Sequence, residues 1–336
     1  MKKGYPWIDR MRIIAAILVV SIHISPFVQL NPTVDFILTR VIGRLAVPFF
    51  FITTSYFLFI NGYPSYEKIK KTIVNLCQWY VISIIIYLPL MFYNHYFQSK
   101  DLLFKIIKDL FIDGTFYHLW YFPAVIIGIL IVLLLRKYFS IKLSFIIVIV
   151  LYFIGLCGDS YYHLATQIPV YKDFINGLFE YMDYTRNGIF FAPLFLMIGA
   201  YIAENKNRLT LKGNSVLFVV SLMLMGLEAQ NISFMDIAKH DSMYILLPVV
   251  SYFMFQLLIY FKGKRYEDMK NLSLYIYIIH PMIIVLVRMI GKIIKMNIII
   301  ENNFVQFIFV LILSIGLSFF VNQFIQGSES YEKNNI

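Results

Sequence analysis

The sequence predicts an all-α protein, a polytopic bundle of about ten transmembrane helices. Three observations favour this fold class. Of the 336 residues, 60% are hydrophobic and only 14% are charged; long apolar runs recur along the whole chain; and basic residues occur in every second polar segment. Soluble domains carry about a quarter charged residues, so this composition excludes a soluble domain of this size.

The apolar runs are long enough to cross a bilayer, for which a helix needs about 20 residues, within a range of about 17–25. The two cysteines, Cys77 and Cys157, give no disulfide framework, and we expect two free thiols. The predicted spans lie near residues 11–29, 36–60, 73–93, 119–135, 141–157, 188–203, 214–229, 243–261, 272–290 and 304–325.

Basic residues predict the orientation. A basic N-terminal segment places that end in the cytoplasm by the positive-inside rule, so that the inner loops are 61–72, 136–140, 204–213 and 262–271. The net charge of +10 is then charge of the inner segments, so the expected partner is the lipid bilayer and not nucleic acid. We therefore expect a multi-pass protein of the cytoplasmic membrane with both termini inside. The basic residues that carry this prediction are Lys2, Lys3, Arg10, Arg12, Lys68, Lys70, Lys71, Arg136, Lys137, Lys206, Arg208, Lys262, Lys264, Arg265 and Lys270.

Two outer segments are long. Residues 100–112 combine an apolar stripe with the pairs Asp101–Lys105 and Lys105–Asp109, which predicts a helix lying on the outer leaflet. Residues 158–187 are polar and rich in tyrosine. A segment of that length is usually functional or partly structured, and a covering loop with an aromatic belt is the alternative.

Arg12 and His23 lie eleven residues apart in one apolar run. Eleven helical steps return the second side chain to within roughly 20° of the first, at a distance of roughly 16 Å along the axis. A cation near one surface and an imidazole deep in the span can therefore face one cavity. Ionisable groups inside a membrane are costly and usually functional. The alternative for Arg12 is a charge that only sets topology.

Arg40 and Arg44 lie one turn apart on one face of the second predicted span. An Arg at mid-membrane costs about 2.5–3.5 kcal/mol, so the pair costs roughly 5–7 kcal/mol. We expect arginines kept at this cost to face a wet cavity or an anion, although Arg40 can instead snorkel to the outer interface. Pro48 favours a role for Arg44, because a proline frees the carbonyl four residues earlier.

Two further histidines belong to predicted spans. His118 opens the fourth span, and His280 lies in the middle of the ninth, directly before Pro281. A lone membrane histidine can also serve only to hydrogen-bond a neighbouring helix. The sequence holds no pair of histidines at helical spacing, no Cys-x-x-Cys and no phosphate-binding loop, so no metal site is predicted.

These residues resemble the motifs of the type-3 membrane acyltransferase family, multi-span enzymes that O-acylate sugars and other cell-envelope acceptors. That family's first helix carries an Arg followed after ten residues by a His, as Arg12 and His23 do here. The family usually has Ser-Gly where this chain has Thr54-Ser55. Because glycine allows helices to approach closely, Ser55 is expected to alter the cavity. Three further motifs match in order: Arg44-Leu-Ala-Val-Pro48-Phe-Phe50-Phe51, His118-Leu119-Trp120 and Tyr277-Ile-Ile-His280-Pro281.

Within that family the sequence is similar to the membrane domain of the vancomycin-resistance serine racemases, through residues 158–162 and 183–193. In those proteins a racemase domain follows the membrane domain, which is thought to bring in L-serine. This chain ends at Ile336, so we expect a membrane domain over 1–326, a cytoplasmic tail over 327–336, and no pyridoxal phosphate. A racemase or a resistance ligase is then an expected partner.

The resemblance implies an O-acyltransferase as the first of two function classes. Acyl-CoA would enter from the cytoplasm as donor, with its phosphates on Arg12. His23, Arg44 and His118 are the expected catalytic residues: an imidazole suits a general base, an arginine stabilises an oxyanion, and His118 shapes the site of a small-molecule or envelope-glycan acceptor. The residues expected to contribute to substrate binding are Arg40, His280, Asp159 and Arg186.

The second class is a carrier for L-serine. In that interpretation Arg44 holds the carboxylate of the amino acid, and His23 relays a proton or lines the path. Transfer of labelled acyl groups and uptake of labelled L-serine distinguish the two classes.

Overall fold

The fold is described from a computed structural model, which places residues 3–205 and 209–334. Lys2, Lys206 and Arg208, three of the basic residues behind the predicted orientation, lie outside the described residues. Within the described part most of the chain is helical, and the strands form one antiparallel pair of two residues each, β1 (Lys3–Gly4) and β2 (Gly263–Lys264). The predicted all-α class is confirmed.

Every predicted span overlaps a helix, and seven helical segments of the described chain are long and apolar enough to cross a membrane. The remaining three are α1, which begins with charged residues, and the shorter apolar helices α10 and α12. The count of ten spans therefore stays a prediction. Cys77 and Cys157 are both free thiols, as expected.

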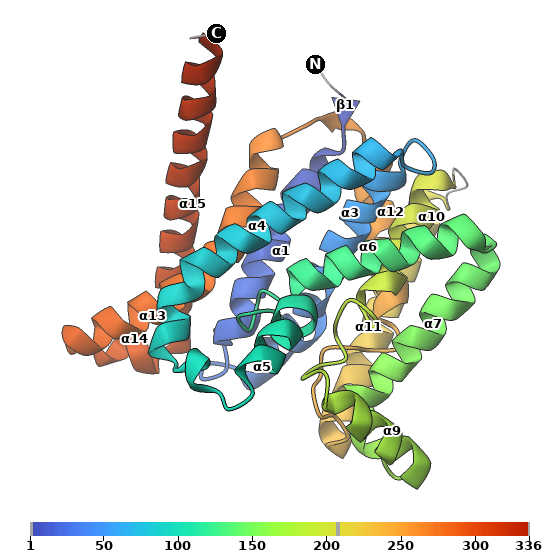
Figure 1. The fold of residues 1–336 in the computed structure, drawn as a ribbon, viewed down its shortest axis with the longest axis horizontal. Coiled ribbons are helices and arrows are strands. Elements are labelled where there is room, and N and C mark those ends of the chain that lie inside the picture. Colours follow the sequence, from blue (N-terminus) through green and yellow to red (C-terminus); the bar gives the residue numbers. More distant parts are fainter. Residues whose placement is uncertain (1–2, 206–208, 335–336) are drawn as a thin grey trace. The chain divides into compact units, whose positions relative to one another are not determined.

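The chain divides into two compact units, residues 1–46 with 257–336 and residues 47–256. In the first unit α1 packs against α13, and α13 packs along α15 (Figure 1). Its apolar core includes Ala16, Val20, Ile276, Ile284 and Val310. The helices of this unit are α1 (Pro6–Ile24), α2 (Pro32–Phe36), η1 (Ile37–Ile42), η2 (Gly43–Leu45), α13 (Glu267–Ile293), α14 (Asn297–Glu301) and α15 (Asn303–Asn334).

The second predicted span is helical from Pro32 to Phe59 but is irregular in its first half. After α2 the chain forms the π-helix η1 and then the 3₁₀ helix η2, which contain Arg40 and Arg44 respectively. A π-bulge inside a helix occurs frequently at functional sites. Regular α-helix resumes in α3, close to Pro48, whose missing N–H prevents an unbroken ladder of hydrogen bonds.

In the second unit α6 packs against α10 and α7, and α4 packs against α6 (Figure 1). Helices α3 and α12 pass from one unit into the other. The helices of this unit, with these two included, are α3 (Ala46–Phe59), α4 (Tyr66–Tyr93), η3 (Tyr96–Gln98), α5 (Leu102–Lys108), η4 (Asp109–Asp113), α6 (Tyr121–Tyr138), α7 (Ile141–Gly158), α8 (Tyr162–Ala165), α9 (Pro169–Phe179), α10 (Ala192–Glu204), α11 (Leu211–Met235) and α12 (Leu247–Tyr260).

A glycine on a neighbouring helix lies opposite Ser55, where the chain departs from the family's Ser-Gly. A Cβ atom added to Gly199 of α10 would lie 2.4 Å from the carbonyl oxygen of Ile52 and 3.0 Å from the Cβ atom of Ser55. The close approach of the two helices is therefore achieved with the glycine on α10 and the serine on α3.

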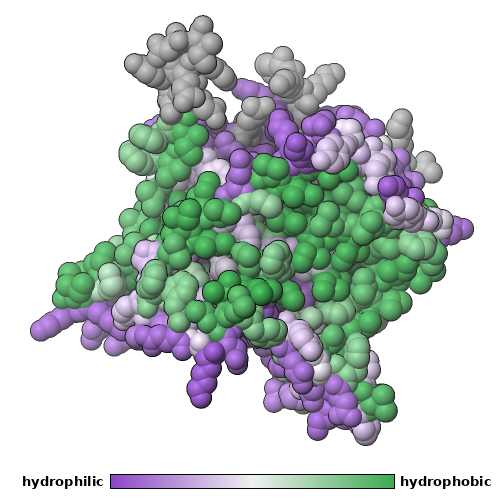
Figure 2. Space-filling view, viewed as in Figure 1, coloured by the Kyte–Doolittle hydropathy of each residue, from purple (hydrophilic) through white to green (hydrophobic). Residues whose placement is uncertain are grey.

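Apolar side chains cover the exposed faces of the long helices. On α4 they include Val74, Val81, Ile82 and Ile85, and Figure 2 shows the same character over α4 and α6, with hydrophilic residues gathered at helix ends. In water such faces would be unfavourable, because they form large contiguous apolar patches. The faces are suited to contact with lipid chains.

The two long outer segments are partly helical. Residues 100–112 form α5 and η4, which leave Leu103, Phe104 and Ile107 exposed, as a helix lying on a membrane would. Of the two predicted pairs, Lys105–Asp109 is present, with 3.1 Å between Nζ and Oδ2. The segment 158–187 contains α8 and α9, so the prediction of a partly structured segment is confirmed.

Candidate functional site

Arg12 lies in α1 and contacts Asp9, one turn earlier. The Arg12 Nη1 atom is 3.4 Å from Asp9 Oδ1, and both residues are buried, with 8% and 4% of their surface exposed. Asp9 Oδ2 also accepts a hydrogen bond of 2.9 Å from the Tyr266 backbone N–H. A buried charge is unfavourable unless it is paired. Asp9 therefore both balances Arg12 and fixes it against the segment that leads into α13.

His23 stacks on His280. Their ring centroids are 5.4 Å apart and their planes are 27° from parallel, so an α1 residue meets an α13 residue from the other end of the chain. His280 is fully buried, and its Nδ1 atom lies 3.0 Å from the Ile276 carbonyl oxygen. A carbonyl oxygen can only accept, so Nδ1 carries the hydrogen. That hydrogen bond fixes the ring of His280, and His23 rests against it.

Arg44 lies beside the point where α1 approaches η2 most closely. A Cβ atom added to Gly43 would lie 2.9 Å from the Cγ1 atom of Ile22, so only glycine allows this contact. His23 follows Ile22 in sequence, and Arg44 follows Gly43. Arg44 is half-buried and Arg40 is exposed.

Five of the eight predicted site residues therefore belong to the first unit. His23 and His280 are in direct ring contact, and Arg40 and Arg44 lie on helices packed against α1. Arg12 lies on the same helix, about three turns before His23, as the spacing predicted. The other three residues, His118, Asp159 and Arg186, belong to the second unit.

His118 is enclosed by aromatic rings. It has only 2% of its surface exposed, and the ring centroids of Tyr87, Phe116 and Tyr117 lie 4.8, 5.7 and 5.5 Å from its own. Gly114 makes the turn before it, with φ of +82°, and an added Cβ atom would lie 2.2 Å from the Trp120 backbone nitrogen. Any side chain at Gly114 would displace the segment that carries His118.

Arg186 lies over two aromatic rings. Its guanidinium carbon is 5.3 Å from the centre of the Trp120 ring and 4.6 Å from that of Tyr184. The Tyr184 ring in turn contacts His240, with 4.5 Å between centroids. A cation over aromatic faces is attracted by their quadrupoles. Trp120 thus links the neighbourhood of Arg186 with the segment of His118.

Asp159 is a fully buried junction between two segments. Its carboxylate accepts hydrogen bonds from the Ser242 backbone N–H at 2.7 Å, the Ser242 hydroxyl at 2.6 Å, the Met243 N–H at 3.0 Å and the Ser160 hydroxyl at 2.9 Å. The bonds from Ser242 and Met243 join the end of α7 to the segment before α12. They give Asp159 a clear role in the fold, and its role in substrate binding stays a prediction.

Two acidic residues with defined contacts were missed by the sequence reasoning. Asp9 was detectable from its i,i+3 spacing to Arg12. Glu228, in α11, accepts hydrogen bonds from the backbone N–H groups of Ile245 and Leu246 and from the Tyr161 hydroxyl. Those amides directly precede α12, so the carboxylate lies where a helix N-terminus favours negative charge. An acid inside a predicted span was the available signal for Glu228.

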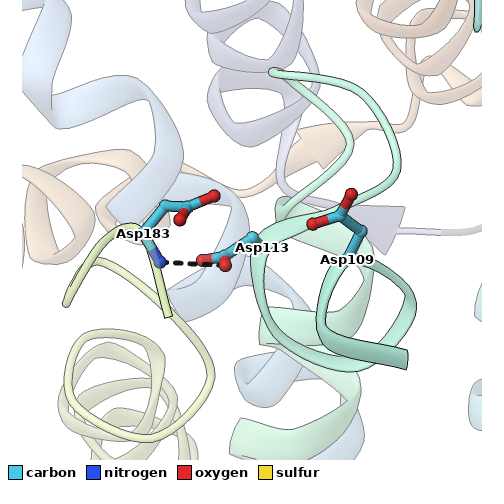
Figure 3. Close-up of side chains that lie close together, drawn as sticks. All are labelled: Asp109, Asp113 and Asp183. Carbon is cyan, nitrogen blue, oxygen red and sulfur yellow. Dashed lines mark hydrogen bonds between the residues drawn. The ribbon is translucent and has the colours of Figure 1, made fainter. Parts of the chain in front are cut away.

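A group of charged side chains joins α5 and η4 to the segment before α10. Figure 3 shows the carboxylates of Asp109, Asp113 and Asp183, and one oxygen of each lies within 4.8 Å of one oxygen of each of the others. The Asp183 backbone N–H donates to Asp113 Oδ2 over 2.9 Å. Lys108 contacts both Asp113 and Asp183, and Lys105 contacts Asp109. Two ammonium groups of the chain thus offset most of the charge of the three carboxylates.

Burial raises the pKa of Asp113 to about 6, against the opposing effects of the Asp183 N–H and of Lys108. Burial also lowers the pKa of Lys108, but the contacts with Asp183 and Asp113 outweigh this, and the pKa of Lys108 is raised. The pKa of Asp113 is thus brought toward the neutral range.

Comparison with known families gives a direct result: residues 5–323 match the acyltransferase-3 family model, described as an acyltransferase domain. The chain belongs to this family. The match covers both units and all eight predicted site residues. An acyltransferase-3 protein with long apolar helices is a multi-pass membrane protein, as predicted.

Three curated relatives of this acyltransferase-3 chain carry racemase names. An amino-acid racemase of Enterococcus faecalis is 42% identical over 81% of this chain and 38% of its own length; a second from that organism is 37% identical over 95% and 46%. A serine/alanine racemase of Enterococcus gallinarum is 36% identical over 96% of this chain and 46% of its own length. The chain thus spans less than half of each relative. No solved structure matches it.

Proposed function

We propose that this protein is a membrane O-acyltransferase that moves an acyl group from acyl-CoA, entering from the cytoplasm, to a hydroxyl group of a cell-envelope acceptor. Membership of the acyltransferase-3 family supports this reaction class. The observation that carries the proposal for the site is the contact of His23 with His280, beside the close approach of α1 and η2 at Arg44.

In the proposed reaction His23 is the general base. It takes the proton of the acceptor hydroxyl while the acceptor oxygen bonds to the thioester carbonyl carbon. The carbon–sulfur bond then breaks, and the proton held by His23 passes to the leaving thiolate of coenzyme A. Arg44 stabilises the negative charge that develops on the carbonyl oxygen.

His280 is a positioning residue in this proposal. The two rings are stacked, with their planes 27° from parallel. Stacking on His280 holds the orientation of the His23 ring. The Ile276 carbonyl fixes His280, and His280 holds His23.

The other predicted residues are assigned by unit. Arg12 binds the phosphates of acyl-CoA at the inner end of α1, whereas His118 and Arg186 belong to the acceptor side, in the second unit. Both termini are proposed to lie in the cytoplasm, because the inner loops are basic. Reporter fusions after Lys71 and Ile336 test this orientation, and an outside signal from either contradicts it together with the role of Arg12.

Transfer and uptake assays on one preparation test the proposed function. Purified protein in proteoliposomes receives labelled acetyl-CoA with envelope material on the opposite side and, in a parallel reaction, labelled L-serine. We expect label in the envelope material with wild-type protein and none with His23→Ala, at unchanged folded yield. Because the relatives carry racemase names, serine uptake without acyl transfer is the informative contrary outcome: it would replace the enzyme with a serine carrier.

A further inference from the structure

An open pocket of about 400 Å³ lies in the second unit, where α4 ends and the chain turns through η3 toward α5. Its lining includes Asn94, His95, Tyr96, Lys105 and Phe116. Its volume falls in the range of about 300–1,000 Å³ typical of sites for small molecules. None of the residues predicted from the sequence to form the site lines this pocket.

The pocket wall presents one ammonium group that a ligand can reach. Lys105 is its one permanently charged group, and no carboxylate belongs to its lining among the described residues. The Lys105 ammonium gives one contact to Asp109 Oδ2, at 3.1 Å, and about a third of the side chain is exposed. An ammonium has three donors, so Lys105 can also donate to a ligand. Tyr96 supports this placement: its hydroxyl donates to Asp109 and its ring lies 4.8 Å from the Lys105 Nζ atom.

The rim of the pocket favours hydroxyl groups. Asn94 and Gln98 are exposed and carry amides, each of which both donates and accepts hydrogen bonds. A hydroxyl group needs both kinds of partner at once, whereas a simple anion needs only donors. The lining therefore combines one donor for a negative charge with several groups that can bind hydroxyls.

The pocket adjoins the surroundings of His118. Phe116 lines the pocket and also contacts His118, with 5.7 Å between ring centroids. One aromatic ring therefore separates the pocket from the histidine assigned to the acceptor side.

We propose that this pocket binds the acceptor, and that the acceptor is a small hydroxylated molecule with a carboxylate. Lys105 binds the carboxylate, and Asn94 and Gln98 bind the hydroxyl groups. The identification of the ligand as acceptor rests on the proposed function; the binding itself does not.

Direct binding tests the proposal without acyl-CoA. The full-length protein in nanodiscs is titrated with glucuronate, with glucose, which lacks the carboxylate, and with propionate, which lacks the hydroxyls. We expect saturable binding of glucuronate and at least tenfold weaker binding of each of the other two. Loss of a charge-assisted hydrogen bond weakens binding by about tenfold or more, so Lys105→Gln should do so and Lys105→Arg should bind nearly as wild type.

Two further variants complete the test, one as a control and one as an independent change in the pocket. Lys100→Gln removes an exposed lysine of the same segment that does not line the pocket, and it should bind glucuronate as wild type does. Gln98→Ala changes an exposed rim residue without disturbing the Lys105–Asp109 pair, and it should weaken binding even if Lys105→Gln proves poorly folded. The proposal is overturned if wild type does not bind glucuronate, or if Gln98→Ala and a folded Lys105→Gln both bind it undiminished. If the protein binds glucuronate but transfers no acyl group, the proposed function is contradicted and the proposed binding site is still supported.

Discussion

His23 and His280 hold each other in a stacked pair, although they come from opposite ends of the chain. His280 contributes a ring that is fixed at both sides, by burial and by the Ile276 carbonyl, while His23 is half-buried. The more accessible partner is the one that can meet a substrate. In the proposed reaction His23 is therefore the base, and His280 restricts the orientations that it can adopt.

Substitution of His280 should affect turnover more than donor binding. His280→Ala removes the ring that supports His23, so we expect kcat to fall at least tenfold with little change in KM for acyl-CoA. His280→Phe keeps a ring for stacking and should retain more of kcat than the alanine variant. His163→Ala, in the segment between α7 and α9, is the matched control and should behave as wild type. An alanine variant of normal folded yield with wild-type kcat would remove His280 from this role.

Arg12 provides a test of donor binding with a matched control a short distance away. Arg12→Gln should weaken acyl-CoA binding by about tenfold, and Arg12→Lys should retain much of it, because a lysine replaces the point charge. Arg10→Gln is the matched control. It removes an equal charge from the same segment, but Arg10 lies over the Trp7 ring and is not assigned to acyl-CoA. If binding per folded molecule falls equally in both glutamine variants, the role of Arg12 is only topological.

Much of the fold could be predicted from the sequence, because a membrane-spanning chain must satisfy its backbone within each helix. The apolar runs therefore mark the helices directly, and the spacing of Arg12 and His23 places both on α1. The π-helical geometry around Arg40 was not predictable, since it follows from the packing of η1 and η2 on α1. Gly43 shows how tight that packing is.

The partners of the site residues were harder to predict than the residues themselves. No periodicity relates His23 to His280, and only the packing of α1 on α13 brings them together. Asp159 was predicted as a polar residue of a long segment, but its three hydrogen bonds from residues 242–243 depend on a contact between distant parts of the chain. The pocket at Lys105 is likewise formed by two segments that no motif connects.

Gly199 tests the close packing of α10 on α3. In Gly199→Ala the new methyl group would lie 2.4 Å from the Ile52 carbonyl oxygen, a backbone atom that cannot rotate away. Overpacking of this kind typically costs about 1–3 kcal/mol, so the thermal midpoint should fall. Gly177→Ala in α9 is the control, because an added Cβ there meets nothing within 4 Å, and alanine favours helix by up to about 1 kcal/mol. Equal midpoints for both variants would contradict the packing described here.

The last prediction concerns the pH dependence of stability that Asp113 contributes. Burial raises its pKa from 3.8 to about 6, so the folded protein binds this proton more tightly than the unfolded chain does. The stabilisation from protonation is therefore absent above about pH 7 and is gained as the pH falls through about 6 toward 4. Asp113→Asn carries no titrating group and cannot gain it. The difference in thermal midpoint between wild type and Asp113→Asn should thus shift in favour of wild type between pH 7.5 and pH 5, with Asp101→Asn as the control for loss of an exposed carboxylate. A difference that stays constant over this range would show that Asp113 does not titrate there in the folded protein.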